Sequence, residues 1–431
     1  MKNNQIIKNI IEDSLIEIKP THQETQRINE FIKDFLKNIN KKIKKNKSEA
    51  DVHIGGSVAK DTLIKKSKYD IDVFVRFGKK HWKQDISKLL KKILPTKVMK
   101  IHGSRDYFSI KQGDIEFEII PCLKIDKPEQ AQNITDLSYF HVNYVKNKLR
   151  KNKKLADEIR LAKAFAYYQE CYGAESYING FSGYALELLI IYYKSFMNFI
   201  KAMSKLKLDS KDKIGLRDKL IIDMDKSYKN KNQIIEELNS SKLQGPVILI
   251  DPTFKQRNAL AALSSQTLKK FQLYCKMFLK NPDIDFFILK NKAQELREKH
   301  NRDLIEIEIT TNKQKGDIAG TKLKKFYNYF ANELKNNFDI KVKDFEYYEK
   351  ENKGKMFFVL KQKKSIVFNG PPVKMKKQFE KFKKKHKKII IKNSRAYAIE
   401  KPINLKQLLD SYKKDKHKKK VLREMDIKIH F

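Results

Sequence analysis

The segment Asp70-Ile-Asp-Val-Phe-Val-Arg-Phe77 is the most informative part of this 431-residue chain. Its apolar residues alternate with a period of two, which is typical of a β-strand that has one buried face. Side chains two positions apart project from the same face, so we expect Asp70 and Asp72 to point the same way. Two neighbouring carboxylates repel each other, and a divalent cation compensates for this. Hard oxygen ligands of this kind suit Mg²⁺.

A second segment, Ile115-Glu-Phe-Glu-Ile119, has the same alternation and follows a turn-like sequence at 111–114. Glu118 then lies on the polar face of a second strand. A third carboxylate from a neighbouring strand would complete a site for two metal ions, in which one ion activates an attacking hydroxyl and the other holds a triphosphate. Glu116 is expected to be a solvated neighbour of this site rather than a ligand.

Between the first helix and the Asp70 strand lies Gly55-Gly56-Ser57, followed by a polar segment at 58–66 that we predict to be helical. Gly56 and Ser57 offer backbone N–H groups without side-chain bulk, a hydroxyl and a helix N-terminus, which together suit a triphosphate. Each motif is weak when taken alone. Their order and separation are what favour a nucleotide site.

The rest of the chain suggests an α+β protein with several domains. Thr21-His-Gln-Glu24 is a capping box that opens a long amphipathic helix. We predict a domain at 1–140 with a mixed sheet that carries the catalytic carboxylates, and a helical central domain at 141–262 that completes the nucleotide pocket. The last region, 263–431, is predicted to be an α/β RNA-binding body and tail, with a helix at 266–279 and strands at 304–310 and 356–360.

The charge of the chain points to a polyanionic partner. There are 94 Lys and Arg residues against 52 Asp and Glu residues, which gives a formal charge of +42. Such a surplus disfavours the compact state unless a polyanion or counterions offset it. Nucleic acid is therefore the leading partner and an anionic membrane surface the second. Codon bias towards Lys is the alternative explanation for any single lysine run.

Insertion into a membrane is not expected, and a reducing cytoplasm is the expected location. The most apolar stretch, 184–193, is shorter than a membrane span and contains Glu187. The N-terminus is too polar and acidic for a secretory signal. The three cysteines are far apart and show neither a disulfide framework nor a zinc-site spacing.

The segments Gly56-Ser-Val-Ala-Lys60-Asp-Thr62, Asp70-Ile-Asp72 and Glu118-Ile-Ile-Pro121 together resemble the nucleotidyltransferase superfamily of DNA polymerase beta, poly(A) polymerase and oligoadenylate synthetase. Further motifs are similar to those of the archaeal class (class I) of CCA-adding enzymes, the tRNA nucleotidyltransferases. These motifs are Lys163-Ala-Phe, Tyr172-Gly-Ala-Glu, Gly180-Phe-Ser-Gly-Tyr184, Asp251-Pro252 and Arg257-Asn258. The resemblance runs in register from about Thr21 to about Leu263 and is looser beyond that point.

The resemblance implies a role for each matching residue. Asp70, Asp72 and Glu118 would be the catalytic carboxylates that hold two Mg²⁺ ions, although the family generally has Asp where Glu118 stands. The residues that would contact the nucleotide are Gly56, Ser57, Lys60, His141, Lys163, Tyr172 and Arg257. Lys60 stands where Arg is usual, which keeps the charge but loses bidentate contact. Arg257 would help to read the incoming base.

The same residues also admit purely structural roles. His141 could be a packed histidine at a helix start, Lys163 a solvated helix lysine and Tyr172 a core aromatic. Arg257 could simply pair with Asp251. Without the resemblance, these structural roles would be favoured.

The function implied is sequential addition of C, C and A to the 3′ end of tRNA from CTP and ATP, with release of pyrophosphate. Two alternatives stay open, namely a poly(A) polymerase or oligonucleotide synthetase of the same superfamily and a catalytically silent RNA-binding protein. The expected partner is tRNA, gripped at its acceptor and T arms by phosphate contacts. Lys383, Lys384 and Lys385, within the basic segment 374–388, are the candidates for those contacts. A homodimer is compatible with this interpretation, and the oligomeric state is left open.

Overall fold

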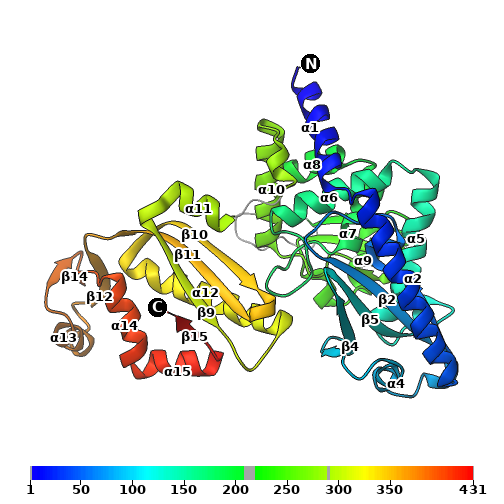
Figure 1. Ribbon diagram of the computed structural model, residues 1–431. Helices are drawn as coiled ribbons and strands as arrows, with labels where there is room; N and C mark the ends of the chain where they lie inside the picture. The colour runs from blue at the N-terminus through cyan, green and yellow to red at the C-terminus, as the bar shows by residue number, and fades with distance from the viewer. Residues whose placement is uncertain (1, 208–218, 289–291, 431) are drawn as a thin grey trace. The chain divides into compact units, whose positions relative to one another are not determined.

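The computed structural model describes residues 2–207, 219–288 and 292–430 (Figure 1). Its contacts divide the chain into two units, Met1–Leu289 and Lys290–Phe431. This division lies beyond the boundary that we predict at 262/263, because helix α10 (Ser265–Lys280) packs Leu268, Phe271 and Phe278 into the helical core of the first unit. The three-domain division remains a prediction.

The first unit contains a five-stranded sheet in the order β1-β2-β5-β4-β3. Strands β2 and β5 are parallel, and the other neighbours are antiparallel, so the sheet is mixed as predicted. The strands are β1 (Ala50–Ile54), β2 (Tyr69–Phe77), β3 (Met99–Ile101), β4 (Tyr107–Gln112) and β5 (Ile115–Leu123). Both segments with period-two alternation are therefore confirmed as strands.

One face of this sheet forms a hydrophobic core with helices α2 (His22–Lys45) and α4 (Ile86–Ile93) (Figure 1). Ile71, Val73 and Val75 of β2 are fully buried there, and burial of such a side chain contributes about 1.5–3 kcal/mol. The predicted capping box is present at Thr21, where α2 begins. Because the core occupies this face, the polar residues of β2 and β5 lie on the opposite face.

The helix predicted at 58–66 is wrong in extent. Helix α3 covers only Gly56–Ala59, and the chain leaves it at Lys60. Asp61 has a left-handed backbone with φ of 51°, which ends the helix, and the Thr62 N–H donates to the Ser57 carbonyl at 3.0 Å. Thr62 and Ile64, which follow, point into the protein interior and are buried.

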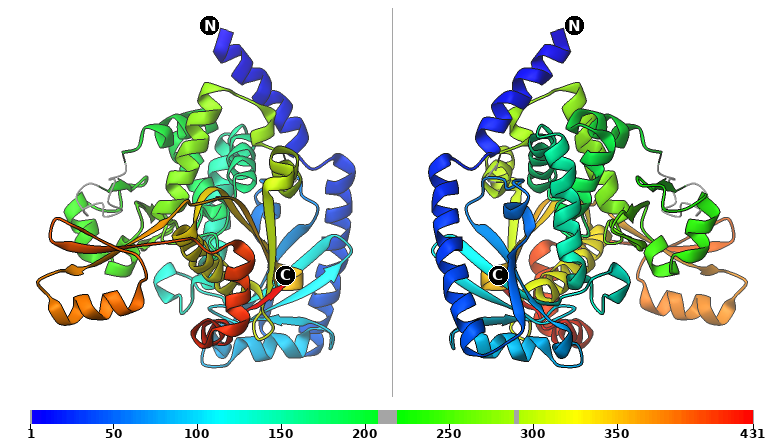
Figure 2. Two further views of the ribbon diagram at one scale, coloured as in Figure 1. Left: turned by 90° about the vertical axis from the view of Figure 1, so that its left-hand side faces the viewer. Right: turned by 90° about the vertical axis from the view of Figure 1, so that its right-hand side faces the viewer.

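A helical body completes the first unit. Its helices are α5 (Ser138–Lys151), α6 (Leu155–Tyr168), α7 (Gly183–Tyr193), α8 (Phe196–Lys205), α9 (Lys231–Glu237) and α10, with a small sheet of β6 (Leu220–Ile222), β7 (Val247–Asp251) and β8 (Phe254–Asn258). Helix α1 (Lys2–Ile18) packs on α6, and its N-terminal part extends away from these helices in both views of Figure 2.

The second unit is built on a four-stranded antiparallel sheet, β10-β11-β9-β15, against which α12 packs. A three-stranded sheet, β12-β14-β13, carries the basic helix α13. The helices are α11 (Lys292–His300), α12 (Gly316–Asn337), α13 (Lys376–Lys385), α14 (Leu405–Lys414) and α15 (Lys416–Met425). The strands are β9 (Leu304–Thr310), β10 (Phe338–Tyr348), β11 (Lys353–Gln362), β12 (Ile366–Pro372), β13 (Ile389–Lys392), β14 (Arg395–Glu400) and β15 (Lys428–His430). Strands β9 and β11 confirm the two that we predict.

None of the helices in the described residues is both long enough and apolar enough to span a lipid bilayer.

Candidate active site

The carboxylates of β2 and β5 share one face of the sheet. In the parallel register, Asp70 is the partner of Glu116, and Asp72 is the partner of Glu118. Neighbouring strands are about 4.8 Å apart, so Asp72 and Glu118 stand side by side. The alternation predicted from the sequence therefore places Asp70, Asp72 and Glu118 together, away from the apolar core.

The electrostatics of this face suit a cation. Burial raises the pKa of Asp72, and the charge of Asp70 raises it further, while Lys60 and Lys163 lower it. Desolvation by the surrounding protein raises the pKa of Asp70 although its side chain is still exposed, and the neighbouring Glu116 adds to that effect. A divalent cation would stabilise both ionised carboxylates, and their oxygen atoms are the ligands that Mg²⁺ prefers.

The third ligand is less well defined than this pair. Across the described ranges, no three His, Cys, Asp or Glu side chains are grouped as they would be around a metal ion. Glu118 shares the face of Asp70 and Asp72 through the strand register, and its role as a third ligand remains a prediction. Glu116 differs from the solvated neighbour that we expect, because it accepts a hydrogen bond from Ser109 and lies 3.4 Å from Lys111.

The glycine turn lies directly against β2. The Gly55 N–H donates to the Asp72 carbonyl at 2.8 Å. Gly56 has a left-handed backbone with φ of 57°, and a Cβ atom there would lie only 1.7 Å from Asp72 Oδ2. A Cβ atom on Gly55 would overlap the ring of Phe74. Only glycine lets the turn approach so closely, and Ser57 follows directly after it in α3.

Lys60 and Lys163 meet at one buried carboxylate. Glu187 of α7 is fully buried, with Oε2 lying 2.6 Å from Lys60 Nζ and Oε1 lying 2.7 Å from Lys163 Nζ. Thr62 donates its hydroxyl to Glu187 at 3.1 Å and accepts from Lys163 at 2.8 Å. Burial lowers the pKa of Lys163 to about 8, although Glu187 opposes that shift. Neither lysine is solvated in the way that a surface lysine would be.

Tyr172 lies next to this cluster. Its hydroxyl packs against Gly183, where a Cβ atom would lie 2.6 Å from it. Lys66 Nζ lies 5.5 Å from the centre of the Tyr172 ring and 4.8 Å from that of Tyr167. Lys66, which the sequence did not single out, also lowers the pKa of Asp70. It is therefore a further cation on the carboxylate side.

A second buried carboxylate, that of Asp251 at the end of β7, contacts both His141 and Arg257. Its Oδ2 lies 2.9 Å from His141 Nε2 and 2.7 Å from Arg257 NH1, and its Oδ1 accepts from the Tyr184 hydroxyl at 2.9 Å. The His141 ring stacks on Tyr184 with centres 4.1 Å apart. The pairing of Arg257 with Asp251 is thus present. It holds the guanidinium against the buried carboxylate.

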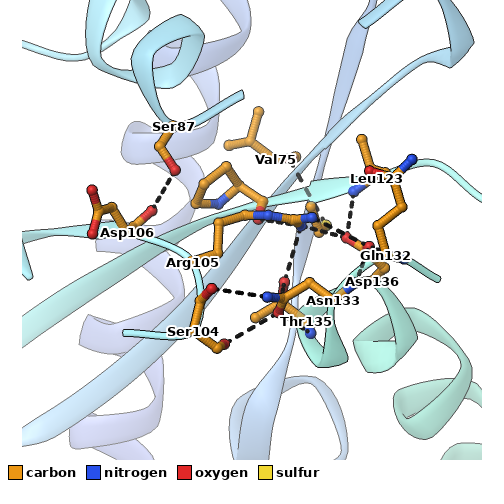
Figure 3. A network of polar contacts seen from close by, with 12 residues as sticks. Val75, Ser87, Ser104, Arg105, Asp106, Leu123, Gln132, Asn133, Thr135 and Asp136 are labelled. Atoms are coloured by element: carbon orange, nitrogen blue, oxygen red, sulfur yellow. Dashed lines mark hydrogen bonds and ion pairs between the residues drawn. The ribbon is translucent and has the colours of Figure 1, made fainter. Parts of the chain in front are cut away.

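A third buried carboxylate has a structural role at the carboxyl end of β5 (Figure 3). Asp136 accepts hydrogen bonds from the backbone N–H groups of Leu123 at 2.8 Å and Asn133 at 2.9 Å, and it pairs with Arg105. Arg105 also donates to the carbonyl of Pro121 at 3.3 Å. This network fixes the end of the strand that carries Glu118.

The predicted RNA-binding lysines lie on α13 in the second unit. Lys383, Lys384 and Lys385 are all exposed in the last turn of this helix. Phe379 is buried beneath it, and the ring of Phe382 covers Gly370, so the apolar seam of the helix is docked on its own sheet. Lys383 pairs with Glu380 at 3.0 Å, which ties one of the three side chains locally.

The sequence indicates Asp251 as a partner of Arg257 but not of His141, and it does not indicate Glu187 as the partner of Lys60 and Lys163. The signal for Glu187 was present, because an isolated carboxylate in an otherwise apolar helix must be paired when it is buried. What the sequence could not supply was the identity of its partners, which come from segments far away in the chain.

Two family models match the first unit. The model described as "Nucleotidyltransferase domain" matches residues 36–140, and "tRNA nucleotidyltransferase, second domain" matches residues 157–288. Among solved structures, one titled for the RNA terminal uridylyl transferase activity of Cid1 aligns with a TM-score of 0.50 at 12% identity, covering 66% of this chain and 98% of that chain. This likeness concerns the fold alone.

Curated relatives match over most of the chain. The CCA-adding enzyme of Nanoarchaeum equitans is 34% identical over 355 residues, which is 81% of this chain and 83% of that protein. The CCA-adding enzyme of Methanocaldococcus jannaschii is 29% identical over 91% of this chain and 87% of its own length. On the strength of this identity and coverage, the chain belongs to the family of CCA-adding enzymes.

Proposed function

We propose that this protein adds C, C and A in sequence to the 3′ end of tRNA, using CTP and ATP and releasing pyrophosphate. The observation that carries the proposal is the parallel pairing of β2 and β5, which sets Asp70, Asp72 and Glu118 on one face in a chain of this family. The names of the relatives favour tRNA as the acceptor over the poly(A) or oligonucleotide products of other superfamily members.

The carboxylates would hold two Mg²⁺ ions, which when bound supply charge neutralisation at the reacting phosphate and activation of the attacking hydroxyl. The chain's own residues bind and orient. Ser57 and the backbone of the glycine turn would receive the triphosphate, and Lys60 at the end of α3 would add positive charge. Catalysis then rests mainly on positioning the 3′ hydroxyl in line with the α-phosphorus and on neutralising charge.

Arg257 would select the base. Its guanidinium is oriented by Asp251 and lies 5.6 Å from the centre of the Tyr184 ring. A donor-only group suits the acceptor atoms that cytosine and adenine share and disfavours the donor atoms of uracil and guanine. His141, held by the same carboxylate, and Tyr172 would contribute further phosphate and ribose contacts.

The second unit would bind tRNA through its phosphates, with Lys383, Lys384 and Lys385 among the contacts. Phosphate contacts fix the position of the acceptor and T arms without reading their sequence. The cytoplasmic location and the homodimer remain predictions.

The decisive experiment supplies purified protein with Mg²⁺, one labelled NTP at a time and tRNA that lacks its terminal trinucleotide. We expect CTP alone to extend the tRNA by two residues and ATP to be added only after them. A tRNA that ends in CC should accept a single A, and EDTA should abolish both reactions. Long A tails without prior C addition would instead identify a poly(A) polymerase, and no incorporation from any NTP would identify a silent RNA-binding protein.

A further inference from the structure

We propose that Glu187 is a positioning residue for triphosphate binding, which holds the two lysines of the site through one shared carboxylate. This inference rests on the proposed function, because it takes Lys60 and Lys163 as the cations that face the triphosphate. It goes beyond that function by assigning the arrangement of both cations to an acidic residue in the middle of helix α7.

The burial of the cluster makes this pairing necessary. The side chains of Glu187, Lys60 and Lys163 are 0%, 7% and 3% exposed. A buried ammonium group without a partner would lose its proton or turn towards solvent. One carboxylate shared by two lysines leaves a net charge of +1 in the protein interior, and the charges of both lysines act on Asp72.

The hydrogen bonds give the two lysines different tasks. The three N–H groups of Lys163 are matched by Glu187 Oε1 at 2.7 Å, the Thr62 hydroxyl at 2.8 Å and the Thr62 carbonyl at 3.4 Å. Within the part of the chain that the structure describes, Lys60 Nζ has one acceptor, Glu187 Oε2 at 2.6 Å. Lys60 therefore has two N–H groups left for phosphate oxygens, whereas Lys163 contributes mainly its charge.

Thr62 links the two halves of the site. Its hydroxyl donates to Glu187 and accepts from Lys163, so it closes a ring of three polar groups between α7, α6 and the segment after α3. Lys60 begins that segment, and Ser57 lies in α3 just before it. The buried ring therefore joins the phosphate-binding turn of the sheet domain to the helical body.

The test compares Glu187→Gln with Glu158→Gln, a matched control on α6. Glu158 is a half-buried carboxylate whose partner is the backbone N–H of Phe196 rather than a lysine. We expect Glu187→Gln to raise the KM for CTP about tenfold while kcat at saturating CTP stays within about threefold, because Glu187 does not touch the reacting atoms. The control should lower thermal stability without raising KM. An unchanged KM in Glu187→Gln would overturn the proposal.

A double-mutant cycle tests whether Glu187 acts through Lys60. If it does, combining Glu187→Gln with Lys60→Met should raise KM by much less than the product of the two single effects. Effects that multiply fully would show that Glu187 acts independently and would contradict the proposal. If Glu187→Gln does not fold, Thr62→Val removes the bridging hydroxyl but keeps every charge, and it should still raise KM about threefold. An unchanged KM in Thr62→Val would then count against the positioning role.

Direct binding of CTP to the full-length protein, in the presence of Mg²⁺ and without tRNA, separates this inference from the proposed function. If Lys60→Met and Lys163→Met both bind CTP like the parent, the triphosphate site itself is misplaced. If both bind CTP more weakly but Glu187→Gln does not, the site assignment stands and the role of Glu187 is refuted.

Discussion

The lysines of the first unit and those of helix α13 in the second unit use the same charge in opposite ways. Lys60 and Lys163 are buried and share Glu187, whereas Lys383, Lys384 and Lys385 are exposed on a helix whose apolar side is docked. The comparison teaches that a count of charges along the sequence identifies the exposed lysine run of α13 but does not identify the buried lysines of the first unit. A surface lysine is one of many, while a buried lysine is defined by its acidic partner.

The largest effect should come from Asp70 and Asp72, the pair that we propose to bind metal. Changing Asp70 or Asp72 to Ala should lower turnover by several orders of magnitude, because the charge at the reacting phosphate would no longer be neutralised. Affinity for tRNA should barely change. Turnover and tRNA binding should be measured side by side with Asp114→Ala, whose carboxylate pairs with Arg27 on the surface of the same sheet. A variant that retains a tenth of the activity would remove that aspartate from the site.

Gly56→Ala should be the next most damaging change. The new methyl group would collide with Asp72, and the alanine would have to keep the left-handed backbone conformation of Gly56. Because both effects would displace the turn, we expect turnover to fall about a hundredfold. Gly113→Ala is the matched control, because Gly113 also has a positive φ, of 66°, but has no atom within 4 Å of the added methyl group. Similar losses in both variants would point to backbone strain alone rather than to the contact with Asp72.

Two substitutions of Glu118 test whether this residue is a metal ligand beside Asp70 and Asp72. Glu118→Asp restores the residue that the family generally has, so we expect at least moderate activity, whereas Glu118→Gln removes a charge and should be much less active. The Mg²⁺ dependence of turnover should be titrated for both variants. If Glu118→Gln equals the parent, Glu118 is not a metal ligand.

Substitution of Arg257, which Asp251 orients, tests whether this arginine determines the choice of NTP. Arg257→Ala should increase misincorporation of U or G and also slow C and A addition, because the oriented guanidinium is lost. Competition between NTPs measures the change in preference. Lys255→Ala, on the same strand but paired with Glu237 at the surface, should leave the preference unaltered. Uniform slowing of all NTPs would assign Arg257 a structural or phosphate-binding role.

The smallest effect is expected in the second unit. Replacing Lys383, Lys384 and Lys385 with Gln should weaken tRNA binding and flatten its log–log salt dependence by roughly one to two units. Turnover at saturating tRNA should change little. The control replaces Lys44, Lys45 and Lys47, which form an equally exposed run at the end of α2. If both triple variants keep the parental slope, these runs are solvated surface and reflect codon bias.

The sequence predicted the sheet better than it predicted the turn beside it. The alternation of Asp70 to Phe77 defined β2 and its buried face correctly, because a period of two depends only on local geometry. The helix predicted at 58–66 was wrong, because Thr62 is drawn inward to hydrogen-bond with Glu187 on α7. That interaction joins residues far apart in the chain, and no local pattern could reveal it.

The same limit applied to the candidate site. The pairing of Arg257 with Asp251 could be offered from the sequence as a structural alternative, but only the folded chain shows that His141 binds the same carboxylate. The residues that the sequence identified carry positive charge or metal-binding oxygen atoms at recognisable motifs. Glu187, which it did not identify, lies in an apolar segment, where the residue type alone does not indicate what it contacts.

The parallel pairing of β2 and β5 also has a consequence for how the enzyme folds. Strands β4 and β5 form a hairpin across a short turn and can pair early in folding. Strand β2 can pair with β5 only after the long chain segment between them, which includes α4 and β3, has formed a closed loop. The carboxylates of Asp72 and Glu118 meet only once that closure is complete. Catalytic competence should therefore be gained late in folding, and partly folded chains that already contain the hairpin should lack nucleotidyltransferase activity.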